Sequence, residues 1–172
     1  MVILNAINAT FVVKLFKMIT STHLHAMVVH FPIALLIVGF LSELIALFYH
    51  KSFFSNAAFY LLLLGTAGTV VSYLAGNAAG EGMEEGSLGK AMELHEQAAT
   101  VVLWLTIVTA AVYLGFYFFK YRKTWAKMLG IILFSVVIAA IVRTGYLGGQ
   151  LVYKHGAGVQ LALPDFSAPA NE

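Results

Sequence analysis

The sequence predicts an all-α integral membrane protein, an antiparallel four-helix bundle with an N-terminal amphipathic interfacial helix. Of its 172 residues, 60% are hydrophobic and only 10% are charged, and the mean hydropathy of +0.87 lies well above that of soluble domains. Four apolar runs are each long enough to cross about 30 Å of hydrocarbon. Because the connections between these runs are short, consecutive helices should be antiparallel neighbours.

The N-terminal segment, residues 1–24, is predicted to lie on the membrane surface rather than to cross it. Its apolar side chains gather on one helical face, and Lys14 and Lys17 stand near its end, where hydrocarbon disfavours them. An amphipathic helix of this kind lies in the membrane interface. A signal-like segment is the alternative, but no small-residue cleavage site precedes a soluble domain.

The four spans should form one bundle over residues 25–159, followed by a short tail over residues 160–172. They are expected in the apolar stretches of the chain, at about residues 27–49, 56–79, 97–119 and 126–153. The connection around residues 120–127 carries four basic residues between aromatic anchors. By the positive-inside rule this turn is cytoplasmic, which places both chain termini on the outer side. Gly156 is well placed as the left-handed residue that ends the fourth helix.

Two ionisable side chains, Glu43 and Arg143, lie deep inside the predicted spans, where each would be costly alone. Counted inward at 1.5 Å per residue, Glu43 lies about 20 Å below His30, and Arg143 lies about 18 Å below His155. We therefore expect an ion pair between the first and fourth spans. The alternative is that each side chain snorkels or faces a neighbouring subunit.

The histidines gather at one face of the membrane. In an antiparallel bundle, the starts of the first and third spans share that face with the ends of the second and fourth. Five of the six histidines in the sequence fall there, namely His23, His25, His30, His95 and His155. Any one of them alone has an ordinary explanation, such as capping of helix carbonyls by His155. Their convergence predicts a cofactor site held by His25, His30, His95 and His155, because imidazole is the commonest metal ligand.

Small residues beside these histidines favour haem b over a bare metal ion. The chain contains no cysteine, so a thiolate cluster and a covalently attached haem are excluded. A noncovalent haem needs axial histidines and space, and Gly76, Gly148 and Gly149 would provide the space. Aromatic walls are expected from Phe31, Tyr73, Trp104, Tyr146 and Tyr153. A copper or zinc site, which needs only the imidazoles, stays open.

The first choice of axial pair is His30 with His95, since both lie near the outer ends of their helices at similar depth. His25 and His155 would then form a second site or hold the propionates and the loop. If the first helix instead begins before His30, Pro32 kinks it, and the five-residue separation rotates His25 about 140° away from His30.

Two sequence signatures at the ends of the bundle resemble those of a known family. They are His25-x4-His30-Phe-Pro-Ile-Ala and Leu147-Gly-Gly-x-Leu-Val-Tyr153-x-His155-Gly. Together they resemble domain-of-unknown-function family 2231, a bacterial family of four-span membrane proteins, although Ala26 stands where the family often has proline. The resemblance implies that the family's histidines correspond to the four named above. Some members are joined to Rieske-type iron–sulfur domains, which implies respiratory or photosynthetic electron transfer.

The expected function is that of a membrane b-type haem-binding, cytochrome-like subunit that transfers electrons near the outer face of a bacterial inner membrane. We expect a non-catalytic electron-transfer or accessory subunit, because no Ser/His/Asp set or H-E-x-x-H helix is present. The alternatives are copper or zinc binding and a structural subunit without cofactor. Expected partners are the lipid bilayer and other membrane or periplasmic redox proteins, or a second copy. The net charge of +2 is too small and scattered to indicate nucleic acid.

Overall fold

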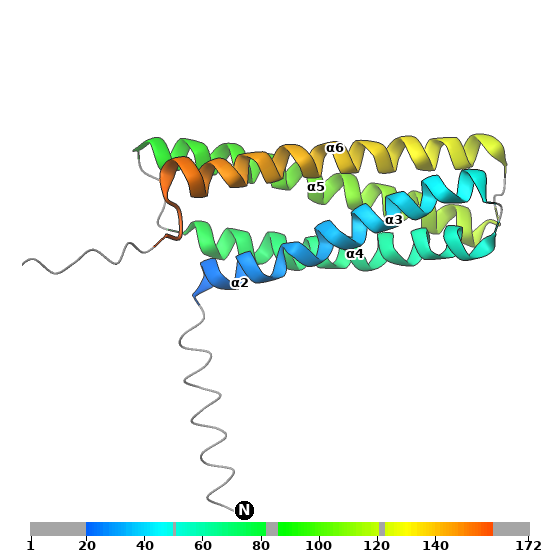
Figure 1. The fold of residues 1–172 in the computed structure, drawn as a ribbon, viewed down its shortest axis with the longest axis horizontal. Helices are drawn as coiled ribbons and strands as arrows, with labels where there is room; N and C mark the ends of the chain where they lie inside the picture. The colour runs from blue at the N-terminus through cyan, green and yellow to red at the C-terminus, as the bar shows by residue number, and fades with distance from the viewer. Residues whose placement is uncertain (1–19, 50, 82–85, 121–122, 160–172) are drawn as a thin grey trace, which may run out of the picture.

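The computed structural model describes residues 20–49, 51–81, 86–120 and 123–159. The helices in these ranges, in chain order, are α2 (Ser21–Val28), α3 (His30–Phe48), α4 (Ser52–Gly80), α5 (Gly86–Phe118) and α6 (Thr124–His155). Four helical segments are long and apolar enough to cross a membrane, the first being α2 and α3 taken together. They lie side by side as an elongated bundle (Figure 1). The predicted all-α membrane bundle is therefore confirmed.

The first span begins earlier than the hydropathy of the sequence indicates. Thr20 caps α2, because its hydroxyl accepts a hydrogen bond from the backbone N–H of His23 at 3.3 Å. His25 thus lies within a helix, one turn before α3 begins at His30. Residues 1–19 and the tail 160–172 lie outside the described residues, so the surface segment stays a prediction.

The helices associate as two hairpins. The most extensive contacts join α3 to α4 and α5 to α6, while the contacts between the hairpins, α4 with α5 and α3 with α6, are fewer. The hairpins meet at a dry core in the middle of the bundle, made by Leu36, Leu62, Val102, Ala110, Phe134, Val137 and Ile141. This core closes the middle of the bundle, and the ribbons of the two hairpins lie further apart at the end where α2 begins (Figure 1).

The outer surface of the bundle is apolar on every span. Large hydrophobic side chains such as Val38, Leu64, Val108 and Val142 are between 50% and 65% exposed. An apolar surface of this extent would be unfavourable in water. Its place in a membrane protein is contact with the lipid bilayer.

The position of Glu43 corrects the expected ion pair. Glu43 is buried at 6% exposure, whereas Arg143 is exposed on the surface of α6. The ammonium of Lys127 on α6 donates to the Ala46 carbonyl of α3 at 2.9 Å. The structure therefore brings Lys127, rather than Arg143, to the part of α3 that carries Glu43.

The reason for this difference is the length of α6. His95 of α5 contacts Gly148 of α6, so these two residues lie at the same depth in the bundle. From Gly148, α6 continues for about 10 Å before it ends at His155. Counting inward from His155 therefore placed Arg143 too deep. Gly156 ends the helix in the left-handed conformation, with φ 66°, as predicted.

Candidate functional site

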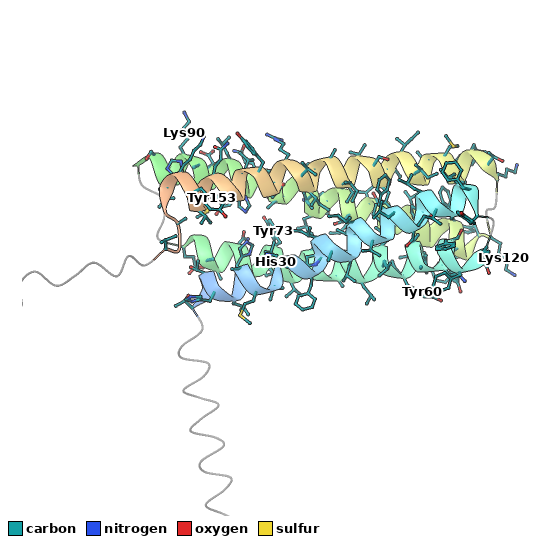
Figure 2. All side chains as sticks on the ribbon, in the orientation of Figure 1. His30, Tyr60, Tyr73, Lys90, Lys120 and Tyr153 are labelled. Atoms are coloured by element: carbon teal, nitrogen blue, oxygen red, sulfur yellow. The ribbon has the colours of Figure 1, made fainter. Side chains whose placement is uncertain are left out.

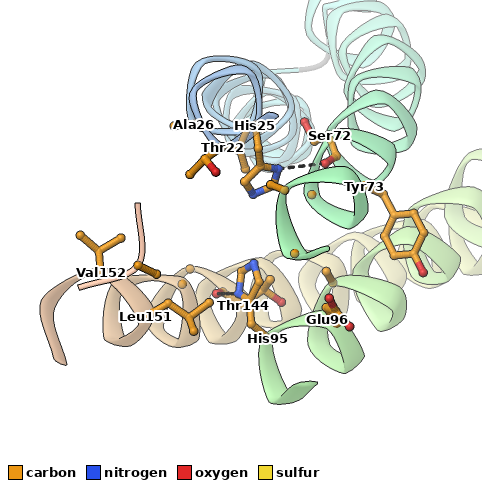
Figure 3. Close-up of a pocket in the computed structure, with 18 of the residues that line it drawn as sticks. Thr22, His25, Ala26, Ser72, Tyr73, His95, Glu96, Thr144, Leu151 and Val152 are labelled. Carbon is orange, nitrogen blue, oxygen red and sulfur yellow. Dashed lines mark hydrogen bonds between the residues drawn. The ribbon is translucent and has the colours of Figure 1, made fainter. Parts of the chain in front are cut away.

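A cavity opens between the two hairpins at the end of the bundle where α2 begins and α6 ends. Its volume is about 580 Å³, and side chains of all five helices line it (Figure 3). Volumes of about 300–1,000 Å³ are typical of sites that enclose a small molecule or cofactor. Most of the lining is apolar. The segment after α6 helps to close the cavity, since Gly158 packs against the Thr22 methyl of α2.

His25 enters the cavity from the first hairpin. Its Nδ1 lies 3.1 Å from the backbone carbonyl of Ser72 on α4. The imidazole rests against Gly76, one turn further along α4, where a Cβ atom would approach its Cε1 to 3.0 Å. Glycine at this position is what allows the ring to lie flat against the helix backbone.

His95 enters the same cavity from the second hairpin and is held in the same way. Its Nδ1 lies 3.2 Å from the backbone carbonyl of Thr144 on α6. A Cβ atom at Gly148, four residues after Thr144, would approach its Cε1 to 3.1 Å. Each hairpin therefore presents one imidazole fixed by a carbonyl and by a glycine four residues later.

These hydrogen bonds define the donor atom of both rings. A carbonyl oxygen only accepts, so Nδ1 of each imidazole donates, and in the neutral tautomer with this donor Nε2 keeps its lone pair. Among the described residues, neither His25 nor His95 hydrogen-bonds through Nε2. Figure 3 shows the two rings pointing toward one another from opposite walls of the cavity.

The spacing of the two rings is that of a shared metal. Their centroids lie 6.5 Å apart and their planes are inclined at 84°. A metal ion lies about 2 Å from a ligating imidazole nitrogen and so roughly 3.2 Å from the ring centroid, which would put the centroids of two imidazoles on opposite sides of it roughly 6.4 Å apart. At the observed separation His25 and His95 would be able to hold one metal ion between them.

Ser72, one of the cavity-lining residues, has a hydroxyl without a partner among the described residues. Ser72 is 6% exposed, and its Oγ makes no hydrogen bond to any described residue. A buried hydroxyl in this state is unfavourable. The backbone carbonyl of the same residue, Ser72, is the hydrogen-bond partner of His25.

The remaining predicted ligands are placed differently. His30 lies at the rim of the cavity, exposed, with its Nδ1 bonded to the Ala26 carbonyl of its own helix turn at 2.7 Å. His155, in the last turn of α6, does not line the cavity. The structure therefore pairs His95 with His25 rather than with His30. The early start of α2 is the physical reason, since it extends the first span past His30 and carries His25 inward.

The predicted glycines and part of the predicted aromatic wall do line the cavity. Gly76, Gly148 and Gly149 are all there, as are Tyr73 and Tyr153, the latter 90% exposed. The other expected aromatic residues are more than 60% exposed and lie outside the lining, namely Phe31, Trp104 and Tyr146. Sequence reasoning missed the backbone carbonyls of Ser72 and Thr144 as hydrogen-bond partners of the two histidines.

The number of protein ligands distinguishes the candidate cofactors. Within the described ranges, no group of three or more His, Cys, Asp or Glu side chains is arranged to hold a metal ion. A zinc site normally takes three or four protein ligands. A haem iron needs only axial ligands from the protein, because the macrocycle supplies the others. Two facing imidazoles in a roomy apolar cavity fit the second case.

Comparison with known proteins adds a family but no activity. A family model described as a predicted membrane protein, DUF2231, matches residues 21–161. No curated protein and no solved structure matches the chain. The matched range contains His25 and His95 and all five described helices.

Proposed function

This chain belongs to the DUF2231 family of predicted membrane proteins, and we propose that it binds a b-type haem between its two hairpins, with His25 and His95 as axial ligands. The observation that carries the proposal is the 6.5 Å separation of two imidazoles whose Nδ1 atoms are already held by carbonyls. Such outer hydrogen bonds fix the ring orientation and raise the basicity of the ligating nitrogen.

The proposed role is electron transfer. Haem supplies one-electron chemistry, and ligation by two histidines leaves no open iron position for oxygen or a substrate. The protein contributes orientation of the two rings and an apolar enclosure, through the walls of the cavity between α4 and α6. Low polarity around an iron centre is one of the factors by which a protein sets its reduction potential.

A reduced-minus-oxidised optical spectrum of the purified protein tests this proposal directly. We expect the Soret and α bands of a low-spin b-type haem, with stoichiometric haem by pyridine haemochrome assay. Two imidazole ligands give a low-spin iron, which is why both bands should sharpen on reduction. Protein that carries no haem but retains stoichiometric copper or zinc would disprove the assignment.

The cavity is proposed to lie near the outer, periplasmic face of a bacterial inner membrane, within a respiratory or photosynthetic complex. The basic residues Lys120, Lys123 and Lys127 mark the opposite end of the bundle, and the positive-inside rule favours the cytoplasm for that end. Electrons would then be exchanged with a membrane or periplasmic redox protein, or with a second copy of the chain.

Single-cysteine labelling tests this orientation, because the sequence has no native cysteine. In intact cells, Lys90→Cys at the cavity end should react with a membrane-impermeant maleimide. Lys123→Cys at the basic end should react only after permeabilisation. The reverse pattern would move the cavity to the cytoplasmic side.

A further inference from the structure

A second hollow lies at the other end of the bundle, on the outside of the second hairpin. This groove between α5 and α6 has a volume of about 370 Å³ and an almost entirely apolar lining, made by Val112, Gly115, Phe116, Phe119, Trp125 and Leu129. It is far from the histidine cavity along the helices, because Gly115 is about 30 Å from His95 at 1.5 Å per residue.

Gly115 contributes no side chain to the lining of the groove. A Cβ atom built at Gly115 would have no neighbour within 4 Å, so the position opens outward rather than onto another helix. Packing between helices therefore does not explain the glycine. Phe116 and Trp125 form an edge-to-face pair, with ring centroids 6.1 Å apart, at the side of the groove.

The groove is open to the bilayer at the depth where an acyl chain joins its headgroup. Gly115 lies three residues before the end of α5 at Phe118, or about 4.5 Å along the helix axis. Trp125 lies in the first turn of α6 and is 53% exposed, a typical position for an aromatic residue at the membrane interface.

Two lysines lie near the end of this groove that adjoins the connection between α5 and α6. Lys120, which directly follows the groove residue Phe119, is exposed and stands at the basic end of the bundle (Figure 2). Lys123 is also exposed and is the N-cap residue of α6. The sequence contains no acidic residue from Val112 to Leu129. The charged side chains of this stretch are therefore all basic.

We propose that this groove is a binding site for one acyl chain of an anionic phospholipid, whose phosphate contacts Lys120 and Lys123. Basic pockets between transmembrane helices are known to hold anionic headgroups, and an apolar slot directly below them accepts the chain. This site is separate from the proposed haem site, so either can be wrong without the other.

Native mass spectrometry of the full-length protein tests the proposal, with mixed micelles that contain phosphatidylglycerol and phosphatidylcholine of identical acyl chains. The wild-type protein should retain phosphatidylglycerol in preference to phosphatidylcholine. Lys120→Gln and Lys123→Gln should each lower that preference about fivefold, the effect of one cation near an anionic headgroup. Gly115→Leu should fill the groove and remove most of the retained lipid.

Matched variants separate this site from general effects. Lys90→Gln at the opposite end removes the same charge, and Val108→Leu adds bulk on the exposed surface of the same helix, so both should leave lipid retention unchanged. Retention with no preference for phosphatidylglycerol would overturn the proposal. So would a preference that depends on the lysines but survives Gly115→Leu, since charge alone would then bind the lipid. Loss of helix content in Gly115→Leu, measured by circular dichroism, would indicate misfolding, and the lysine variants would then decide.

Discussion

Replacing His95 with alanine should abolish the low-spin haem spectrum, and replacing His25 with alanine should do the same, while His30→Ala leaves it intact. Each of the first two changes removes one of two facing imidazoles 6.5 Å apart. His30 is exposed and bonds to Ala26 within its own helix, so its loss removes no ligand. The loss of haem affinity should exceed the roughly 10–100-fold that removal of an outer-sphere partner costs.

Two controls keep this result interpretable. Circular dichroism should show unchanged helix content, because both rings lie at the cavity rather than in the dry core. Added imidazole should restore the low-spin bands to His95→Gly, since the space and the Thr144 carbonyl remain. Loss of the spectrum in His30→Ala with its retention in His25→Ala would instead favour the pair expected from the sequence.

The second large effect is expected from Gly76→Leu and Gly148→Leu, neither of which removes a ligand. A Cβ atom alone would come within 3.0 Å of the His25 ring at the first position and 3.1 Å of the His95 ring at the second. A leucine side chain must displace the imidazole and break its Nδ1 bond to the carbonyl. We therefore expect haem content nearly as low as in the histidine variants, measured per mole of folded protein.

Gly115→Ala is the matched control for these glycine variants, because a Cβ atom there meets nothing within 4 Å. It should retain wild-type haem content and a slightly more stable helix, since alanine is the better helix former. Full haem content in both cavity variants would show that the rings do not need their glycine supports and would contradict the proposed ligand geometry.

The fold could be predicted because hydropathy and loop length alone determine four antiparallel spans. The same topology correctly brought His25 and His95 to one end of the bundle. It could not decide between His25 and His30, since that choice depends on where the first helix begins, and the Thr20 cap lies ahead of the apolar run. The Ser72 and Thr144 acceptors are backbone carbonyls, which any residue type supplies, so the sequence carries no signature for them.

The weaker contact between the two hairpins bears on the abundance of the protein in the cell. One imidazole comes from each hairpin, and the contacts between hairpins are fewer than those within them. In the proposed complex the haem therefore links the two hairpins across the interface that has fewer contacts. A ligand that binds only the native state stabilises it by about 2.7 kcal/mol at a free concentration of 100 Kd. Chains made when haem is scarce would be the ones whose hairpins separate first, which exposes them to membrane proteases and couples protein abundance to cofactor supply.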